Sequence, residues 1–448
     1  MSEINRKTAS LLLTQARKEM AEARAGDDPH NIAVAAANLG YALFQVNKFS
    51  EGRRSFKEVE RIFKQLDDFK LQVHCLAIQT TAYQATEQFP QAFETAQNIE
   101  KLAVTKEDEE VQCDALATQG QILIDSGEEV IANKKLNEAL EIAKKIGDKR
   151  RQMNAVGAMG NYCMTIASAD KAEAYFRQAR QLAHEVGDRQ AEIGFHGNIG
   201  TILEWKGHLQ EASQIFSDVA AFVHEVGNSS AELQAYRHLV NVHSKMNDLA
   251  NVVIYAQQGV SLAQESNDEI IYHFYKHLIS TNYRLNKLTE ARNATSEAIE
   301  KARTDKNRKL EIDFLLGLGE SYMVTNELEQ SLASYKDALA VAVRMQRMTD
   351  MAHLLGRVGV VLAELNRTDE AIQHHEEAIA LARTHELPDL EGEQLVMLAM
   401  AFDEKGEIEK AKRLCETAVS VYTRANLTEQ ANKARSFLAE LALTGQHV

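Results

Sequence analysis

A repeat of 40 residues constrains this chain of 448 residues more than any other feature of its sequence. One slot of the repeat is mostly glycine, and its ten members are Gly40, Thr80, Gly120, Gly160, Gly200, Val240, Ile279, Gly319, Gly359 and Ala399. Twelve residues further on, a second slot is alanine in seven of the ten units: Gly52, Ala92, Ala132, Ala172, Ala212, Val252, Ala291, Ser331, Ala371 and Ala411. Small residues at fixed places predict that helices cross closely there, since larger side chains would push the backbones apart. A period of this length predicts a solenoid of stacked units.

Each unit reads as a pair of helices. Apolar residues recur at i, i+3, i+4 and i+7, as over residues 172–187, and this is the spacing of an amphipathic helix. Only three prolines occur in the chain, so long helices can run without interruption. Breaks that stop one helix and cap the next recur 40 residues apart, at Gly147-Asp148, Gly187-Asp188 and Gly227-Asn228. We therefore predict an all-α fold of ten helical hairpins, from about residue 33 to residue 432.

The residues at fixed places of the unit resemble a known repeat. Glycine stands at the eighth place, Tyr or Leu at the eleventh, alanine at the twentieth and twenty-seventh, and an aromatic residue at the twenty-fourth, as in Phe56, Phe176, Phe216 and Tyr335. This pattern resembles the tetratricopeptide repeat (TPR). The 40-residue period is similar to the longer-helix subclass found in Pins-type adaptors, in the sensor region of the bacterial maltose-regulon activator and in Rap-type regulators. The resemblance implies a right-handed superhelical solenoid whose first helices line a concave groove.

The two ends of the array differ from its middle. Residues 8–25 align with a second helix only, and residues 428–443 form a last helix with apolar residues on one side. Terminal units of a solenoid need such caps, because one face of an end repeat has no neighbour. We divide the chain into an N-terminal capping half-repeat at 1–32, ten tandem repeats at 33–427, and a C-terminal capping helix with a tail at 428–448.

Charge and cysteine usage restrict the partners and the compartment. With 50 Lys plus Arg against 65 Asp plus Glu, the net charge is −15, which argues against nucleic acid and against anionic membranes as partners. The four cysteines form no CxxC pair and no regular framework, so we expect reduced thiols. The N-terminus has only a three-leucine apolar run, far short of a signal sequence or a spanning helix. We expect a cytoplasmic protein.

The sequence carries no catalytic motif. No Walker phosphate loop, dinucleotide-binding glycine motif, HExxH pair or GxSxG elbow occurs. His273 and His277 stand one helical turn apart, but a closed metal site needs three or four ligands, and no further ligand is identifiable. We therefore predict that the protein is not an enzyme and has no catalytic residues, no metal and no cofactor.

The resemblance directs the search for a site to the groove. In the family, the second, fifth, ninth, twelfth and thirteenth places of each unit face the concave surface. Applied to this chain, those places give ten candidate residues for peptide binding: Asn154, Asn161, Trp205, Arg237, Asn241, Lys245, His273, Lys276, Tyr283 and Arg284. Arg237 and Asn241 have the spacing of the Lys and Asn of carboxylate-clamp repeats, which hold the C-terminus of a peptide.

These residues define the primary hypothesis, a scaffold or adaptor that binds a peptide segment of a partner protein. We expect an acidic stretch or free carboxylate of the ligand on the four cations Arg237, Lys245, Lys276 and Arg284. The three asparagines would hold backbone amides, and Trp205 or Tyr283 would take an apolar side chain.

Two alternatives stay open. Residues 311–448 hold 23 acids and 13 bases, so they carry −10 of the net charge beside a basic middle, and this polarity would suit a self-associating structural protein or homo-oligomer. The Rap-type resemblance suggests a sensor that binds a signalling peptide and controls an enzyme or a transcription factor.

Overall fold

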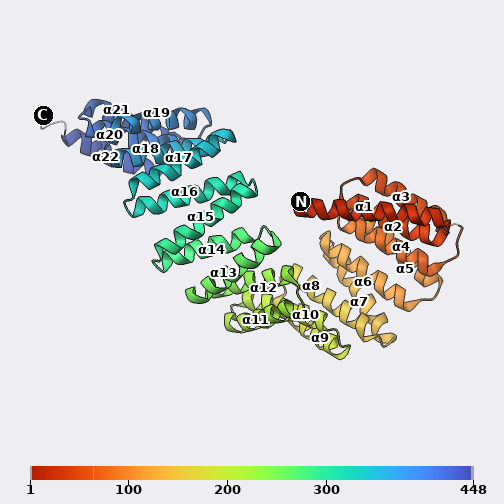
Figure 1. The fold of residues 1–448 in the computed structure, drawn as a ribbon. Helices are drawn as coiled ribbons and strands as arrows, with labels where there is room; N and C mark the ends of the chain where they lie inside the picture. Colours follow the sequence, from red (N-terminus) through yellow and green to blue (C-terminus); the bar gives the residue numbers. More distant parts are fainter. Residues whose placement is uncertain (1–2, 64, 445–448) are drawn as a thin grey trace. The chain divides into compact units, whose positions relative to one another are not determined.

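The computed structural model describes residues 3–63 and 65–444, and over these residues it contains 22 α-helices and no strand (Figure 1). The first eleven helices are α1 (Glu3–Gly26), α2 (Pro29–Gln45), α3 (Phe49–Phe63), α4 (Phe69–Gln84), α5 (Phe89–Thr105), α6 (Glu109–Asp125), α7 (Glu129–Lys145), α8 (Lys149–Thr165), α9 (Ala169–Glu185), α10 (Arg189–Lys206) and α11 (Leu209–Glu225). The remaining helices are α12 (Ser229–Lys245), α13 (Leu249–Ser266), α14 (Ile271–Arg284), α15 (Leu288–Thr304), α16 (Arg308–Val324), α17 (Leu328–Arg344), α18 (Met348–Glu364), α19 (Thr368–Thr384), α20 (Pro388–Glu404), α21 (Ile408–Arg424) and α22 (Thr428–Thr444).

The order of the helices between α1 and α22 fits the ten predicted pairs. The even-numbered helices α2 to α20 are the first helices of the hairpins, and the odd-numbered helices α3 to α21 are the second helices. Within each unit, helices adjacent in the chain pack on one another, as α8 with α9 and α18 with α19, and first helices of successive hairpins also touch, as α2 with α4, α6 with α8 and α18 with α20. The chain is therefore an all-α solenoid of helical repeats, as the 40-residue period predicts.

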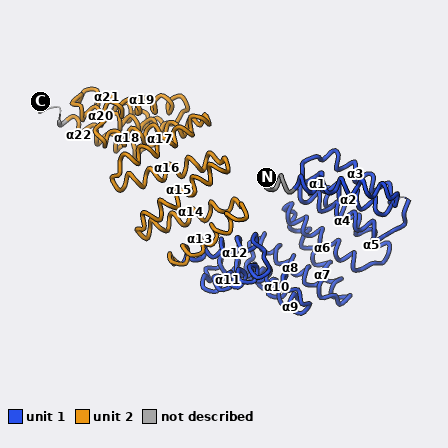
Figure 2. Tube along the Cα trace, in the orientation of Figure 1, with its two compact units in different colours: residues 1–246 blue, residues 247–448 orange. Residues whose placement is uncertain are grey.

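The chain divides into two compact units (Figure 2). Unit 1 comprises residues 1–246 and unit 2 comprises residues 247–448. The boundary lies in the turn between α12 and α13, inside the sixth predicted repeat, where the small-residue slots hold Val240 and Val252. Our division into a capping half-repeat, ten repeats and a final cap stays an interpretation of the helix order.

The glycine slot marks a close crossing of the two helices of a hairpin. A Cβ placed on Gly40 would stand 2.5 Å from the ring of Phe56, and on Gly160 it would stand 2.6 Å from the ring of Phe176. A Cβ placed on Gly319 would likewise stand 2.5 Å from the ring of Tyr335. Because real Cβ contacts are never this short, the glycine of the first helix makes room for the large residue of the second. The prediction that small residues mark close helix crossings is confirmed.

The predicted breaks between hairpins are confirmed as well. Gly147, Gly187 and Gly227 have φ values of 72°, 72° and 71°, in the left-handed region that glycine adopts without strain. The residue after each glycine then caps the next helix: the carboxylate of Asp148, for example, accepts a hydrogen bond from the backbone N–H of Arg151 at 3.0 Å. Local sequence thus sets where each hairpin starts.

The first helix of the first hairpin starts at Pro29, because Asp28 accepts a hydrogen bond from the N–H of His30 and proline suits the first turn of a helix. All four cysteines are buried free thiols, as expected. Within the described part of the chain, no helix is both long and apolar enough to cross a bilayer.

Candidate functional site

Six of the ten predicted site residues belong to unit 1. Asn154 and Asn161 are exposed and lie two turns apart on α8. Trp205, near the end of α10, is 59% exposed. Arg237 and Asn241 are half-buried on α12, one turn apart, and the Nε of Arg237 has no hydrogen-bond partner among the described residues.

The sixth residue, Lys245, is held by an internal partner. Its Nζ lies 2.7 Å from Oε1 of Glu204, which is only 8% exposed. The other carboxylate oxygen of Glu204 lies 3.2 Å from Nδ1 of His238. Burial would raise the pKa of the Glu204 carboxyl, but hydrogen bonds from His238 and Lys245 outweigh this effect and hold the pKa below its usual value. Lys245 therefore neutralises a buried charge of its own chain.

The other four predicted residues lie on α14 in unit 2. Lys276 and Arg284 are exposed, and a guanidinium nitrogen of Arg284 donates to Oδ1 of Asn247. Tyr283 is half-buried, and the ring of His273 lies 4.6 Å from that of His277. Over the residues that the structure describes, no three His, Cys, Asp or Glu side chains gather as a metal site would require.

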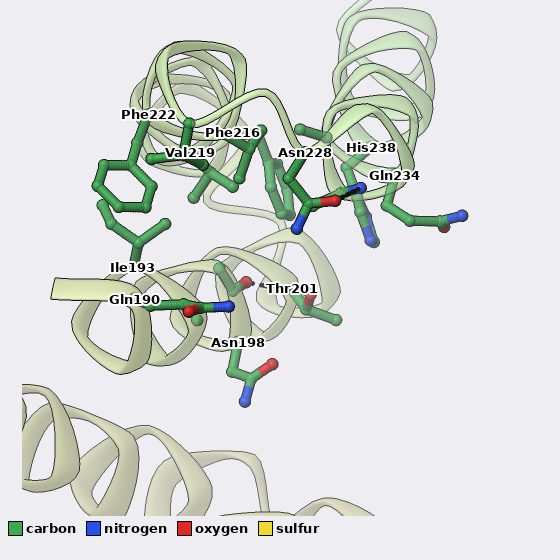
Figure 3. A pocket seen from close by; sticks show the side chains of 16 residues that line it. Gln190, Ile193, Asn198, Thr201, Phe216, Val219, Phe222, Asn228, Gln234 and His238 are labelled. Atoms are coloured by element: carbon green, nitrogen blue, oxygen red, sulfur yellow. Dashed lines mark hydrogen bonds between the residues drawn. The ribbon is translucent and has the colours of Figure 1, made fainter. Parts of the chain in front are cut away.

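A cavity of about 610 Å³ lies within unit 1, between α10, α11 and α12 (Figure 3). Its apolar wall comes mainly from Ile193 of α10 and from Phe216, Val219, Phe222 and Val223 of α11. Its uncharged polar groups are Gln190, Asn198, Thr201, Asn228 and Gln234, together with His238. None of the residues that line it is Asp, Glu, Lys or Arg. Cavities of this size and composition are typical of sites for uncharged, partly apolar ligands.

The repeat explains why this cavity exists. One step earlier in the array, Gly157 of α8, Phe176 of α9 and Phe195 of α10 pack together: the rings of the two phenylalanines lie 6.3 Å apart, and a Cβ on the glycine would stand 2.6 Å from Phe195. The equivalent residues of the next repeat, 40 positions later, are Gly197, Phe216 and Ala235, and all three line the cavity. Ala235 on α12 thus replaces the phenylalanine ring that fills the equivalent space in the preceding repeat, while Gly197 on α10 keeps the glycine.

One wall of the cavity is linked to the buried Glu204. The ring of His238 stacks on that of Phe216, with centroids 4.4 Å apart and an angle of 11° between the ring planes. Because Nδ1 of His238 is also bonded to Glu204, the carboxylate fixes the orientation of the ring that faces the cavity. The contacts of Glu204 thus connect the cavity wall with Lys245, one of the four cations predicted to bind the ligand.

The sequence interpretation missed most of the cavity, although a signal was present. The second, fifth and ninth places of the fifth repeat are Gly194, Gly197 and Thr201, and all three line the cavity. At these places glycine offers no functional group, so a search for charged and aromatic residues selected Trp205 instead. Two glycines at places that face a groove indicate open space, and a Cβ on Gly194 would meet nothing within 4 Å.

The fold and the cavity define an all-α repeat protein with a ligand-sized site between successive hairpins. Residues 274–446 match the family model of the MalT-like TPR region. For this part of the chain, the resemblance to tetratricopeptide repeats of the MalT type is confirmed. No curated protein matches the sequence.

Several solved structures are similar in architecture. The apo form of RapI is 14% identical, with a TM-score of 0.48, and the match covers 77% of this chain and 98% of RapI. Aspartyl phosphate phosphatase F from Bacillus subtilis is 11% identical, with a TM-score of 0.44 and coverage of 77% and 92%. A signal transduction ATPase with a tetratricopeptide repeat sensor, from Pyrococcus horikoshii, is 14% identical, with a TM-score of 0.41 and coverage of 89% and 55%.

Proposed function

We propose that this chain is a non-enzymatic interaction module that binds a peptide segment of a partner protein across the first helices of unit 1. Solenoids of stacked repeats commonly bind partners along an extended surface formed by equivalent helices. The observation that carries the proposal is the cavity between α10, α11 and α12, because it opens beside uncharged side chains that can hold a peptide backbone.

The helices α8, α10 and α12 follow one another closely enough to share a ligand. Phe195 of α10 packs against Gly157 of α8, and Lys245 of α12 binds Glu204 of α10. These helices carry Asn154, Asn161, Asn198, Gln234 and Asn241. A carboxamide both donates and accepts, so it can pair with the N–H and C=O groups of an extended peptide.

The asparagines of α8 give a direct test of this role. A random-peptide display library is selected against the full-length chain, and the affinities of the selected peptides are measured by calorimetry. Replacing both residues (Asn154→Ala with Asn161→Ala) should weaken binding about tenfold or more, by removing side-chain bonds to the peptide backbone. The matched control, Asn137→Ala, changes an exposed asparagine on the second helix α7 and should bind normally. Equal affinity in the double variant would refute the assignment.

The ligand's charge is a separate part of the proposal. We assign Arg237 to an acidic side chain or the C-terminal carboxylate of the ligand, since its buried Nε makes no hydrogen bond among the described residues. Lys276 and Arg284 are exposed cations of unit 2, and Lys245 is engaged by Glu204. Arg237→Gln should abolish the preference for a free carboxylate over an amidated C-terminus. A preference of the same size in this variant would remove Arg237 from the site.

Self-association is the second candidate function. It is favoured by the charge of residues 311–448, which hold 23 acids against 13 bases, in a chain with cations on α12 and α14. Such a contact weakens as salt screens it. Light scattering over a salt series should show a mass that falls as salt rises, and a monomer mass at every ionic strength would exclude it.

A further inference from the structure

We propose that the cavity between α10, α11 and α12 receives an uncharged aromatic side chain of the bound peptide. This inference rests on the proposed peptide-binding function and names the chemistry that its central site accepts. It concerns the cavity alone, so the cations on α12 and α14 play no part in it.

The first argument is the register of the repeat. At the preceding step, the place between the glycine of one first helix and the aromatic ring of the second helix is filled by Phe195. At the cavity, the glycine and the ring are kept as Gly197 and Phe216, but the third residue is Ala235. The walls are therefore those that pack around an aromatic ring in this same protein, and a ring from a ligand can take the position of the phenylalanine.

The second argument is charge. The chain is 26% charged, yet no Asp, Glu, Lys or Arg lines the cavity. The two buried carboxylates of α10 and α12 are already bonded within the chain: Glu204 with Lys245 and His238, and Glu232 with His224 and Tyr236. A charged ligand group would lose its hydration in the cavity without meeting an opposite charge, so an uncharged group is favoured.

The third argument is the kind of contact that the wall offers. Phe216 and His238 form one stacked pair, and Phe222 adds another ring near Ile193 (Figure 3). Aromatic groups gain from such ring neighbours beyond the burial of their area. At the rim, Val226 is 57% exposed and Gln234 is exposed, so apolar and amide groups meet where the peptide backbone would cross.

Two substitutions block the cavity from opposite helices. Ala235→Phe installs on α12 the residue that Phe195 provides one repeat earlier. Gly197→Leu fills the space from α10, where a Cβ would meet only Val219, at 3.8 Å. The matched control is Gly317→Leu, the same change in the first helix α16 of unit 2, where a Cβ meets nothing within 4 Å. Because the two blocking changes are independent, a folding defect in one leaves the other as the test.

The experiment selects peptides from a random display library against the wild-type chain and both blocked variants. Among wild-type binders, we expect Phe, Tyr or Trp to be enriched at one position, and replacing that residue by Ala or Asp should weaken binding at least tenfold. Both blocked variants should lose at least tenfold in affinity for these peptides, and the control should lose none. Peptides that bind the wild type and both variants equally, without a fixed aromatic residue, would overturn the inference and leave peptide binding intact.

A second arm uses indole as a free aromatic probe. Its titration, followed through the methyl NMR signals of Val219, Val223 and Ala235, should shift these signals in the wild type and in the control. If no displayed peptide binds but indole shifts the signals, the cavity is an aromatic site, whose ligand is a small molecule, and the proposed peptide function fails alone. If indole shifts no signal and aromatic peptides show no preference, the aromatic site itself is refuted.

Discussion

The buried pair formed by His375 and Gln394 makes unit 2 sensitive to pH. His375 is 1% exposed, and its Nδ1 lies 2.8 Å from Oε1 of Gln394. Since a carboxamide oxygen only accepts, Nδ1 of the neutral ring carries the proton. Burial lowers the pKa of this imidazole, and the hydrogen bond to Gln394 opposes that effect only in part. The folded chain therefore keeps the ring neutral at pH values where the unfolded chain protonates it.

The sign and size of the effect follow from this difference. Above the ordinary histidine pKa of about 6.5, both states are neutral and His375 adds no pH dependence. As the pH falls below that value, the unfolded state binds one more proton, and the free energy of unfolding decreases by up to about 1.4 kcal/mol per pH unit. The loss continues down to the lowered pKa of the folded state. Between pH 7.5 and 5.5, we expect a loss of up to about 1.4 kcal/mol from this residue.

A double substitution isolates the pair. His375→Phe together with Gln394→Leu installs the types found at the same places in other repeats, Phe176 and Leu354. Changing the histidine alone would leave a buried amide unpaired, which costs about 1–3 kcal/mol whatever the pH. His374, whose pKa burial also lowers, is present in both proteins, so the comparison removes the effect of its burial and keeps its repulsion of a protonated His375 as part of the measured difference.

The assay is hydrogen exchange with mass spectrometry on peptides from α19 and α20, corrected for the pH dependence of intrinsic exchange. Exchange reports local opening, which suits a repeat array whose unfolding need not be two-state. The free energy of opening should fall by about 1 kcal/mol more in the wild type than in the double variant between pH 7.5 and 5.5. Equal losses in the two proteins would show that the histidine does not stay neutral and buried.

Two further predictions concern packing and thiol chemistry. Gly160→Ala should lower the free energy of unfolding by about 1–3 kcal/mol in a urea titration, because its Cβ would stand 2.6 Å from the ring of Phe176; Gly317→Ala, with open space around it, should be neutral or stabilising. Burial raises the pKa of the thiols of Cys75, Cys113 and Cys415 to about 11. Ellman's reagent at pH 8 should therefore modify the native protein far more slowly than the unfolded chain, and a rapid reaction of the native thiols would contradict their burial.

The sequence predicts the fold well because the determinants of the fold are local and repeated. The glycine at Gly40 or Gly160 and the aromatic residue sixteen places later recur in one hairpin after another, so their contact could be inferred from the period alone. The caps depend on adjacent residues, as in Gly147 and Asp148. The cap of α2 follows the same pattern, since Asp28, Asp68 and Asp108 precede Asp148 at steps of 40 residues.

The site is harder to predict because its determinants are distant in sequence and do not repeat. In the sequence, nothing near Lys245 indicates a partner, but in the structure Glu204, 41 residues earlier, forms an ion pair with it. The cavity requires two small residues at once, Gly197 and Ala235, on different helices. Each residue alone fits an ordinary helix, and only the comparison with Gly157 and Phe195 shows that a ring is replaced.

One pair of equivalent repeat positions, the first on a second helix and the other on the next first helix, holds different residues in different repeats. It holds two rings at Phe176 and Phe195, a neutral hydrogen-bonded pair at His375 and Gln394, and a cavity at Phe216 and Ala235. A solenoid tolerates such variety because each repeat packs only on its neighbours, so a change at one step need not disturb the others. The stability changes of Ala235→Phe in unit 1 and of the His375 and Gln394 double variant in unit 2 should therefore add within about 0.5 kcal/mol. A coupling above about 1 kcal/mol in the triple variant, measured by urea unfolding, would show that these steps do not act independently.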